Sequence, residues 1–194
     1  MDYTAQIREY LQLEIEVIQA LDTNAINDVM NLLIEAFEAE KAVYIFGNGG
    51  SSATASHFTN DFNKGISECT EKKFRFICLN DNVPTVMAIA NDLGFEEIFC
   101  FQLRGRLKPG DIVIAISGSG NSPNIINAVE YTRQQGNKVI GITGYNGGKL
   151  KTLADASLHV PINSMQITED IHMIFDHLMM SIFYKTLAGI EHLS

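Results

Sequence analysis

The sequence of 194 residues is poor in three features that each mark a class of protein. It has three cysteines, Cys69, Cys78 and Cys100, without a CxxC pair, so neither a disulfide framework nor a structural zinc knuckle is predicted. Lys and Arg total 14 against 23 Asp and Glu, and the net charge of −9 argues against a nucleic-acid or anionic-membrane surface. No apolar run reaches the roughly 18–20 residues that span a bilayer, and the acidic, amphipathic N-terminus does not resemble a signal peptide. We expect a cytoplasmic protein with free thiols and without nucleic-acid or membrane partners.

The chain does contain short apolar runs that alternate with longer amphipathic patterns. Two patterns with helical spacing come first, at about 3–21 and 24–40, and predict helices that pack on their own sheet or on a neighbouring subunit. Strands are predicted at 42–47, 74–79, 111–117, 138–144 and 156–162. Helices are predicted at 52–64, 83–91, 95–106, 122–135, 148–154 and 165–188. This order favours one α/β domain whose parallel sheet is covered on both faces, with ligands bound beyond the carboxyl ends of the strands.

Two turns rich in glycine and serine each follow an apolar run and open a helical pattern. The first, GNGGSS at 47–52, has neither the G-x-G-x-x-G spacing nor the lysine of G-x-x-x-x-G-K-[ST], so no nucleotide cofactor is predicted. The second is SGSGNSP at 117–123, whose proline suits the first turn of a helix. Free N–H groups and the helix dipole favour an anion there, and hydroxyls without basic side chains suit a phosphate monoester. We expect both turns to line one pocket, with hydroxyls from Ser51, Ser52, Ser117, Ser119 and Ser122.

Ionisable side chains gather in two of the helical patterns. His57 and Asp61 are four residues apart, so they share one face of a helix. The terminal pattern contributes five more groups: Glu169, Asp170, His172, Asp176 and His177. Glu169 and His177 are two turns apart and roughly 80° around the axis, so they can border one pocket. Asp170 fits a solvated carboxylate near the start of the helix, and the pattern leaves the role of Asp176 open.

Five of these stretches, in this order, resemble the SIS (sugar isomerase) domain family and within it the phosphoheptose isomerases. They are GNGGSSATASHFTNDF, AIANDLGFEEIF, GDIVIAISGSGNSPNIINAV, GITGYNGGKLKTLAD and EDIHMIFDH. The resemblance covers nearly the whole chain, including the two leading helical patterns. It implies a single SIS domain over 1–194, with a helical pair at 1–40 for packing and oligomerisation and an α/β sandwich at 41–194.

The resemblance also implies an architecture and an activity. The fold would be a three-layer α/β/α sandwich with a five-stranded parallel sheet, assembled as a homotetramer with active sites between subunits. The reaction would be the ketose–aldose interconversion of sedoheptulose 7-phosphate and D-glycero-D-manno-heptose 7-phosphate, which feeds activated heptose into surface glycans. A proton must move between C1 and C2 through an enediol, which requires a base and an acid or electrophile beside those carbons.

Residue roles follow from the resemblance by position. The substrate would be held by Asn48, Gly49, Ser51, Ser52, Asn91, Asp92, Ser117, Gly118, Ser119, Ser122 and Glu169. Proton transfer would fall to Asp61, Glu169 and His177. A zinc ion would be held by His57, Asp61, Glu169 and His177, since imidazoles and carboxylates are zinc ligands.

The chain departs from the phosphoheptose isomerase pattern at three places. Asp61 occupies a position that is usually glutamate, and Glu169 occupies one that is usually glutamine. The basic residue of a usual GR pair is absent after the first helix of the sandwich, where this chain reads NKGI and Lys64 is the nearest cation. Either Asp61 or Glu169 can therefore be the base, and an isomerase for pentulose or hexulose phosphates is an alternative. A non-catalytic SIS module, like the replication-initiator-associating proteins, is a second alternative. The ionisable groups at all four metal positions favour an enzyme.

Overall fold

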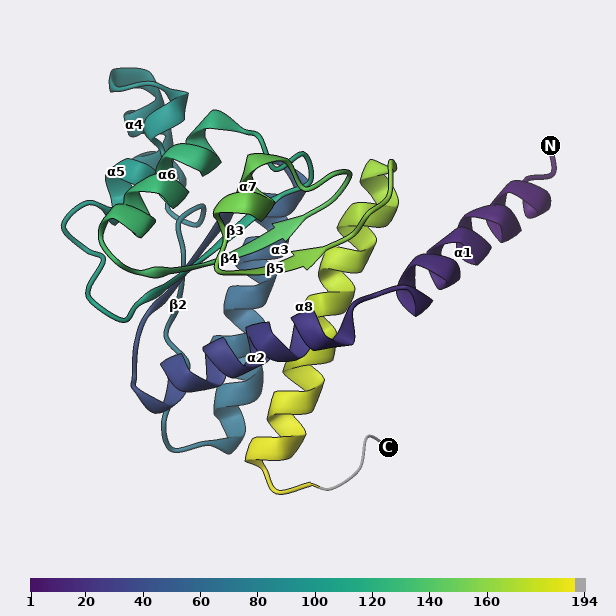
Figure 1. Ribbon diagram of the computed structural model, residues 1–194, viewed down its shortest axis with the longest axis horizontal. Helices are drawn as coiled ribbons and strands as arrows, with labels where there is room; N and C mark the ends of the chain where they lie inside the picture. Colours follow the sequence, from purple (N-terminus) through teal and green to yellow (C-terminus); the bar gives the residue numbers. More distant parts are fainter. Residues whose placement is uncertain (191–194) are drawn as a thin grey trace.

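Five short runs of β-branched and aromatic residues form one parallel sheet. In the computed structural model, which describes residues 1–190, the strand order is β2-β1-β3-β4-β5, and every neighbouring pair is parallel (Figure 1). The strands are β1 (Val43–Gly47), β2 (Phe76–Cys78), β3 (Ile112–Ser117), β4 (Lys138–Thr143) and β5 (Ala156–His159). Their almost continuous burial follows from helices that cover both faces of the sheet.

The helices form the two outer layers. One layer contains α2 (Thr23–Glu38), α3 (Gly50–Asn60) and α8 (Met165–Leu187), and the other contains α4 (Val83–Asp92), α5 (Cys100–Leu103), α6 (Pro123–Gln134) and α7 (Gly148–Leu153). Alternate residues of each strand enter the two cores: Ile45 packs toward α2, α3 and α8, whereas Phe46 packs toward the opposite layer. The structure confirms the predicted α/β/α sandwich with a five-stranded parallel sheet.

The order of the strands places a crevice between β1 and β3. The chain leaves β1 for β2 on one side and then returns to β3 on the other side of β1. The helices that follow these two strands, α3 and α6, therefore lie on opposite faces of the sheet. In a sheet of this order, ligands bind at the carboxyl ends of the two strands that flank the reversal.

The segment 95–106, predicted as one helix, is broken. It contains a 3₁₀ turn at Phe95–Glu97 and the four-residue helix α5. The buried side chain of Gln102 donates to the carbonyl oxygens of Ile98 at 2.7 Å and Leu79 at 3.0 Å. The Ile98 carbonyl is the acceptor that a continuous helix would offer to the Gln102 backbone N–H, so the side chain competes with the helix.

Helix α1 (Thr4–Gln19) projects away from the sandwich and buries none of its residues (Figure 1). Its exposed side chains include Ile7, Leu11, Leu13, Ile15 and Ile18. Tyr10 of α1 donates a hydrogen bond to Asp170 at the start of α8. Among residues 1–190, no helix is long and apolar enough to cross a membrane.

Candidate active site

The turn after β1 opens helix α3 at the carboxyl end of the sheet. Gly49 is the N-cap residue, with a φ of 55° that residues with a Cβ rarely adopt. Ser51 is buried in the first turn, and the Ser52 hydroxyl donates to the Gly49 carbonyl oxygen at 2.7 Å. No side chain of the described residues caps the helix, so its first N–H groups remain available to an anion.

The turn after β3 opens helix α6 in a similar way. The buried Ser117 hydroxyl accepts a hydrogen bond from the Gly120 N–H at 3.1 Å, which fixes the turn. Ser122 is the N-cap residue, and Pro123 occupies the first helical position. The Ser122 side chain makes no capping hydrogen bond within the described chain, which leaves its hydroxyl available to a ligand.

Two asparagines join these turns across the crevice. The Asn48 amide donates to Asn124 Oδ1 at 3.0 Å, and the Asn124 amide donates to Asn48 Oδ1 at 2.9 Å. Asn124 is buried in the first turn of α6. This reciprocal pair holds the β1 turn against the β3 turn and so fixes the width of the space between them.

A pocket of about 150 Å³ lies between the two turns. It is lined by Asn48, Ser51, Ile116, Ser117, Gly118, Ser119, Ser122, Met165 and Glu169. Seven of the eleven residues expected to hold substrate therefore meet in one place. Hydroxyl groups and the N-termini of two helices face the pocket. Among the described residues that line it, only Glu169 has a charged side chain.

Glu169 reaches the pocket from the start of α8 and lies directly over Gly50. A Cβ atom added to Gly50 would fall 2.5 Å from Glu169 Oε2 and 2.6 Å from Oε1. Only the missing side chain at position 50 lets the carboxylate approach the first turn of α3. The glycine thus determines where Glu169 sits, beside the serines of both turns.

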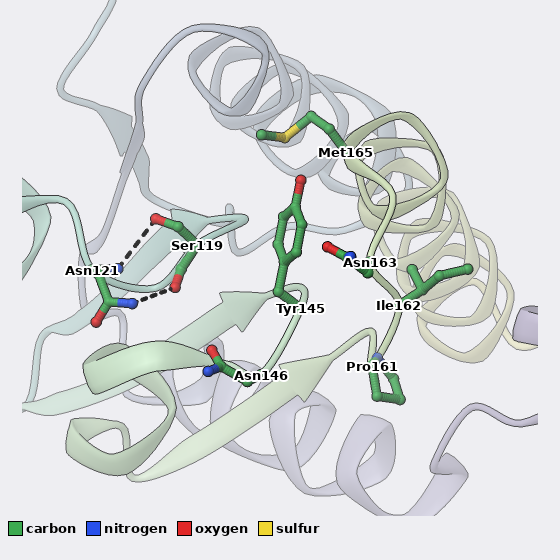
Figure 2. A pocket seen from close by; sticks show the side chains of 8 residues that line it. All are labelled: Ser119, Asn121, Tyr145, Asn146, Pro161, Ile162, Asn163 and Met165. Carbon is green, nitrogen blue, oxygen red and sulfur yellow. Dashed lines mark hydrogen bonds between the residues drawn. The ribbon is translucent and has the colours of Figure 1, made fainter.

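A larger cavity of about 640 Å³ adjoins this pocket and shares Ser119 and Met165 with it. Its lining residues are uncharged: Ser119, Asn121, Tyr145, Asn146, Pro161, Ile162, Asn163 and Met165. The Tyr145 ring stands between Ser119 and Asn163 (Figure 2). Tyr145 has a φ of 49°, a strained value for a non-glycine residue. Its amide donates to the Ile162 carbonyl at 3.2 Å, which helps to hold this conformation.

A second group of polar side chains forms where α3 meets α8. His57 of α3, Asp61 of the π-helical turn η1 (Asp61–Gly65), and Asp176 and His177 of α8 each offer one ligand atom, and these atoms lie within 4.8 Å of one another. His57 Nε2 is 3.1 Å from His177 Nε2 and 3.4 Å from Asp61 Oδ2. The four residues can therefore bind one cation together.

The members of this group differ in burial. The Asp176 side chain is fully buried, that of Asp61 is 14% exposed, and those of His57 and His177 are 44% and 59% exposed. Burial, and next the nearby Asp61 carboxylate, raise the pKa of Asp176 to about 8. In the absence of a cation, Asp176 is therefore protonated at neutral pH.

The composition of this group fits zinc. Two imidazole nitrogens and two carboxylate oxygens form a normal zinc ligand set. The carboxylate oxygens of Asp176 are buried and have no hydrogen-bond partner within the described chain, so they are available as metal ligands. Glu169, expected as a zinc ligand, lies outside this group and in the adjoining pocket.

Other predicted site residues lie outside both groups. Asn91 and Asp92 are exposed at the end of α4, where the Asn91 amide donates to Asp92 at 2.8 Å. Gly49 and Ser52 shape the β1 turn without lining the pocket. Within one described chain, the site is therefore built by the two turns, α3 and α8.

The sequence did not predict a role for Asn124, and it left the role of Asp176 open. Asn124 lies in the NSPN stretch of the β3 turn, but its sequence carries no sign of a partner 76 positions away. Asp176 interrupts the apolar stripe of α8 between Phe175 and Met179, which are both buried. A carboxylate within an apolar stripe is the sequence signal that could have marked Asp176 as a functional residue.

Comparisons with known proteins agree with this geometry. The family model described as SIS domain matches residues 2–144. A curated phosphoheptose isomerase of Aliarcobacter butzleri is 32% identical over 187 residues, covering 95% of this chain and 98% of that protein.

Two solved structures have the same fold. The phosphoheptose isomerase of Francisella tularensis is 30% identical, with a TM-score of 0.86 over 95% of this chain and 100% of that one. The phosphoheptose isomerase of Neisseria gonorrhoeae is 26% identical, with a TM-score of 0.86 over 94% of this chain and 98% of that one. The chain therefore belongs to the SIS domain family, in which it is similar to the phosphoheptose isomerases over almost its whole length.

Proposed function

We propose that the protein is an aldose–ketose isomerase that interconverts sedoheptulose 7-phosphate and D-glycero-D-manno-heptose 7-phosphate. The observation that carries this proposal is the pocket in which the serines of two turns face Glu169, together with the His57 group farther along α3 and α8. A phosphate site beside an acid–base site is what the isomerisation of a phosphorylated sugar requires. The curated relatives named phosphoheptose isomerase support this substrate.

The phosphate would bind between the turns after β1 and β3. Hydroxyls of Ser51, Ser117, Ser119 and Ser122 and the free N–H groups of α3 and α6 supply donors for its oxygens. These groups are neutral, so they orient a phosphate monoester without the lysine of a nucleotide loop. The adjoining 640 Å³ cavity offers uncharged amides and Tyr145 to the hydroxyl groups of a long sugar chain.

Proton transfer would be performed by Glu169 and His177. Glu169 would take the proton from C1 of the ketose and return it to C2. His177 is 59% exposed and can exchange protons with the substrate oxygen, both in ring opening and in enediol formation. A bound divalent ion would supply Lewis-acid polarisation of the carbonyl group. His57, Asp61 and Asp176 would hold that ion, which leaves the His177 imidazole free for proton transfer.

The exposed apolar surfaces support a homotetramer with active sites between subunits. One surface is the unpacked face of α1, and another contains Met87, Leu93 and Phe95 around α4, on the far side of the molecule (Figure 1). Two separate apolar surfaces provide the two kinds of two-fold interface that a tetramer with D2 symmetry needs. Asn91 and Asp92 lie near the second surface, so substrate contacts from them would reach a neighbouring subunit's pocket.

A panel of sugar phosphates tests this function. The purified protein is incubated with ketose phosphates of five, six and seven carbons, with and without zinc, and aldose formation is followed. We expect the largest kcat/KM with sedoheptulose 7-phosphate and a loss of about 10²–10⁴-fold in kcat for Glu169→Gln, the usual range for a general base. A folded protein that converts only hexulose or pentulose phosphates would refute the substrate assignment, and one that converts none would favour a binding module.

A further inference from the structure

The opposite end of the sheet carries a depression of about 140 Å³ that shares no residue with the two pockets of the candidate active site. This amino-end depression is lined by Glu40, Lys41, Ala42, Tyr44, Arg75, Ile77, Lys108 and Asp111. Strand β1 advances about 17 Å between Ala42 and Gly47, so the depression lies far from the serine turns. Its volume is below the roughly 300–1,000 Å³ of pockets for drug-sized ligands, so it suits a small ion or one end of a larger molecule.

Three cationic side chains from separate segments gather around the amino-end depression. Lys41 follows α2, Arg75 precedes β2, and Lys108 precedes β3. None of the three forms an ion pair with a carboxylate among residues 1–190, although the chain has 23 acidic residues against 14 Lys and Arg. The ion pairs that Lys and Arg do form in this part of the chain are Lys64–Glu68, Lys72–Glu38, Arg104–Glu97 and Lys138–Asp155. The three charges around the depression are therefore available to an anion from solution.

A fourth cation, Arg106, lies beside the buried Tyr44 side chain that lines the depression. The Tyr44 hydroxyl donates to the Arg106 carbonyl oxygen at 3.3 Å. Burial, and next the Asp111 carboxylate, raise the pKa of Tyr44, whereas the nearby charges of Arg106 and Arg75 act in the opposite direction. Arg106 also forms no ion pair with a carboxylate in the described chain. Two guanidinium groups therefore flank one phenol at this end of the sheet.

Backbone carbonyl groups hold two of these cations in place. Arg75 Nη1 donates to the Glu40 carbonyl oxygen at 2.9 Å, and Lys41 Nζ donates to the Pro109 carbonyl oxygen at 3.1 Å. Each of these hydrogen bonds uses one donor, whereas a guanidinium group has five and an ammonium group has three. The side chains are therefore ordered before an anion arrives and still have donors for it, which lowers the entropic cost of binding.

The acidic side chains that line the depression do not neutralise these cations. The buried Asp111 carboxylate accepts hydrogen bonds from the backbone N–H groups of Ala42 at 3.0 Å and Lys108 at 2.8 Å. It thereby joins the segments that precede β1 and β3, and both of its oxygens are occupied. Glu40 is exposed, so water screens the repulsion between its carboxylate and a bound anion.

We propose that Lys41, Arg75 and Lys108 form a second anion site, which binds a phosphoryl group at the amino end of the sheet. Arg106 adds a fourth positive charge beside it. The donors suit phosphate, because the N–H groups of arginine match two phosphate oxygens at once and lysine binds phosphate as a point charge. The phosphoryl group can arrive as a free ion or as the end of a phosphate ester. The site does not depend on the isomerase chemistry, since it shares no residue with the serine pocket.

Calorimetric titration with pyrophosphate tests the second site. The serine turns can also bind pyrophosphate, so the titration uses Ser122→Asp, which keeps a side chain suited to the N-cap of α6 and places a like charge in the serine pocket. We expect this protein to bind one pyrophosphate per chain. Lys41→Gln and Arg75→Gln, added separately, should each weaken that binding by about 5–20-fold, since each removes a charged donor at a solvent-accessible site. Glu40→Gln should strengthen it by about twofold to fivefold, because it removes a like charge.

Lys138→Gln is the matched control, because Lys138 begins β4 at the same end of the sheet but pairs with Asp155 at 3.5 Å. It should bind pyrophosphate as tightly as its parent, and circular dichroism checks that every variant is folded. Glycerol 3-phosphate replaces pyrophosphate in a second titration: tighter binding than that of orthophosphate assigns the site to phosphate esters, and weaker binding assigns it to the free ion.

Two results would overturn the proposal. One is a folded Ser122→Asp protein that binds no pyrophosphate, since the serine pocket would then account for all of the binding. The other is an affinity that Lys41→Gln and Arg75→Gln leave equal to that of Lys138→Gln. Because no sugar is turned over, neither result bears on the isomerase assignment, which the panel of ketose phosphates tests separately.

Discussion

Replacing Gly50 with alanine should separate catalysis from stability. The added Cβ would lie 2.5 Å from a Glu169 oxygen, whereas real Cβ contacts are essentially never shorter than 3.0 Å and ordinary ones begin at 3.4 Å. The carboxylate must therefore withdraw by about 0.5–0.9 Å, and a misplacement of about 1 Å at a reacting group can cost about 100-fold in rate. The backbone accepts alanine, since Gly50 begins α3 and does not have a positive φ. Alanine also favours a helix over glycine by up to about 1 kcal/mol.

We expect Gly50→Ala to lower kcat by about 10–100-fold while its free energy of unfolding stays equal to that of the wild type or rises. Steady-state kinetics and denaturant unfolding on the same preparation measure both quantities. Glu169→Gln keeps the shape of the side chain but removes the base, so Gly50→Ala should have little further effect on kcat in that variant. The reasoning would be refuted if Gly50→Ala left kcat unchanged in the wild type. It would also be refuted if Gly50→Ala lowered kcat by the same factor in the wild type and in Glu169→Gln, since the position of Glu169 over Gly50 would then not matter for the reaction.

Three further predictions concern the phosphate turn, the core of α8 and the assembly. Gly120→Ala should lose about 2–4 kcal/mol in urea unfolding, because its φ is +64° and the new Cβ would lie 2.0 Å from the Gly147 carbonyl oxygen. Gly136→Ala, with a φ of +75° and open space around it, is the control and should lose about 1 kcal/mol. Burial lowers the pKa of His172 from 6.5 to about 4, so the unfolded chain binds the proton first as the pH falls. The free energy of unfolding should then drop by about 3 kcal/mol between pH 6.5 and 4, and His172→Leu should lack this part of the pH dependence. Leu11→Asp, on the exposed face of α1, should convert a tetramer into smaller species in analytical ultracentrifugation without a loss of helical circular dichroism, and an unchanged sedimentation coefficient would contradict the role given to α1.

The sheet and most helices could be predicted because their signals are local. The run FRFICL at 74–79, for example, is short, apolar and bounded by polar residues, and it contains β2. The segment at 95–106 has an equally clear apolar pattern, but Gln102 forms hydrogen bonds to Ile98 and Leu79 that no periodicity reveals. Local patterns therefore predict elements well and fail where a buried side chain competes with the backbone.

The part of the site that the order of the strands determines could be predicted from the sequence. Turns after parallel strands meet at one edge of the sheet, so the grouping of the serines followed from their positions in sequence. The side-chain partners did not follow, because they depend on how α8 packs against α3. That packing buries Asp176 beside His57 and places Glu169 over Gly50. Helical spacing alone placed Glu169 and His177 at the border of one pocket and left the role of Asp176 open.

Proton exchange on the sugar itself tests the central claim most directly. Sedoheptulose 7-phosphate is incubated with the zinc-loaded protein in D₂O, and its proton NMR spectrum is followed with time. If the protein is the proposed isomerase, signals of the aldose phosphate will appear, and deuterium from the solvent will enter at C1 of the ketose or C2 of the aldose. Glu169→Gln should slow both changes together. A folded, zinc-bound protein that produces neither aldose signals nor deuterium incorporation would contradict the account.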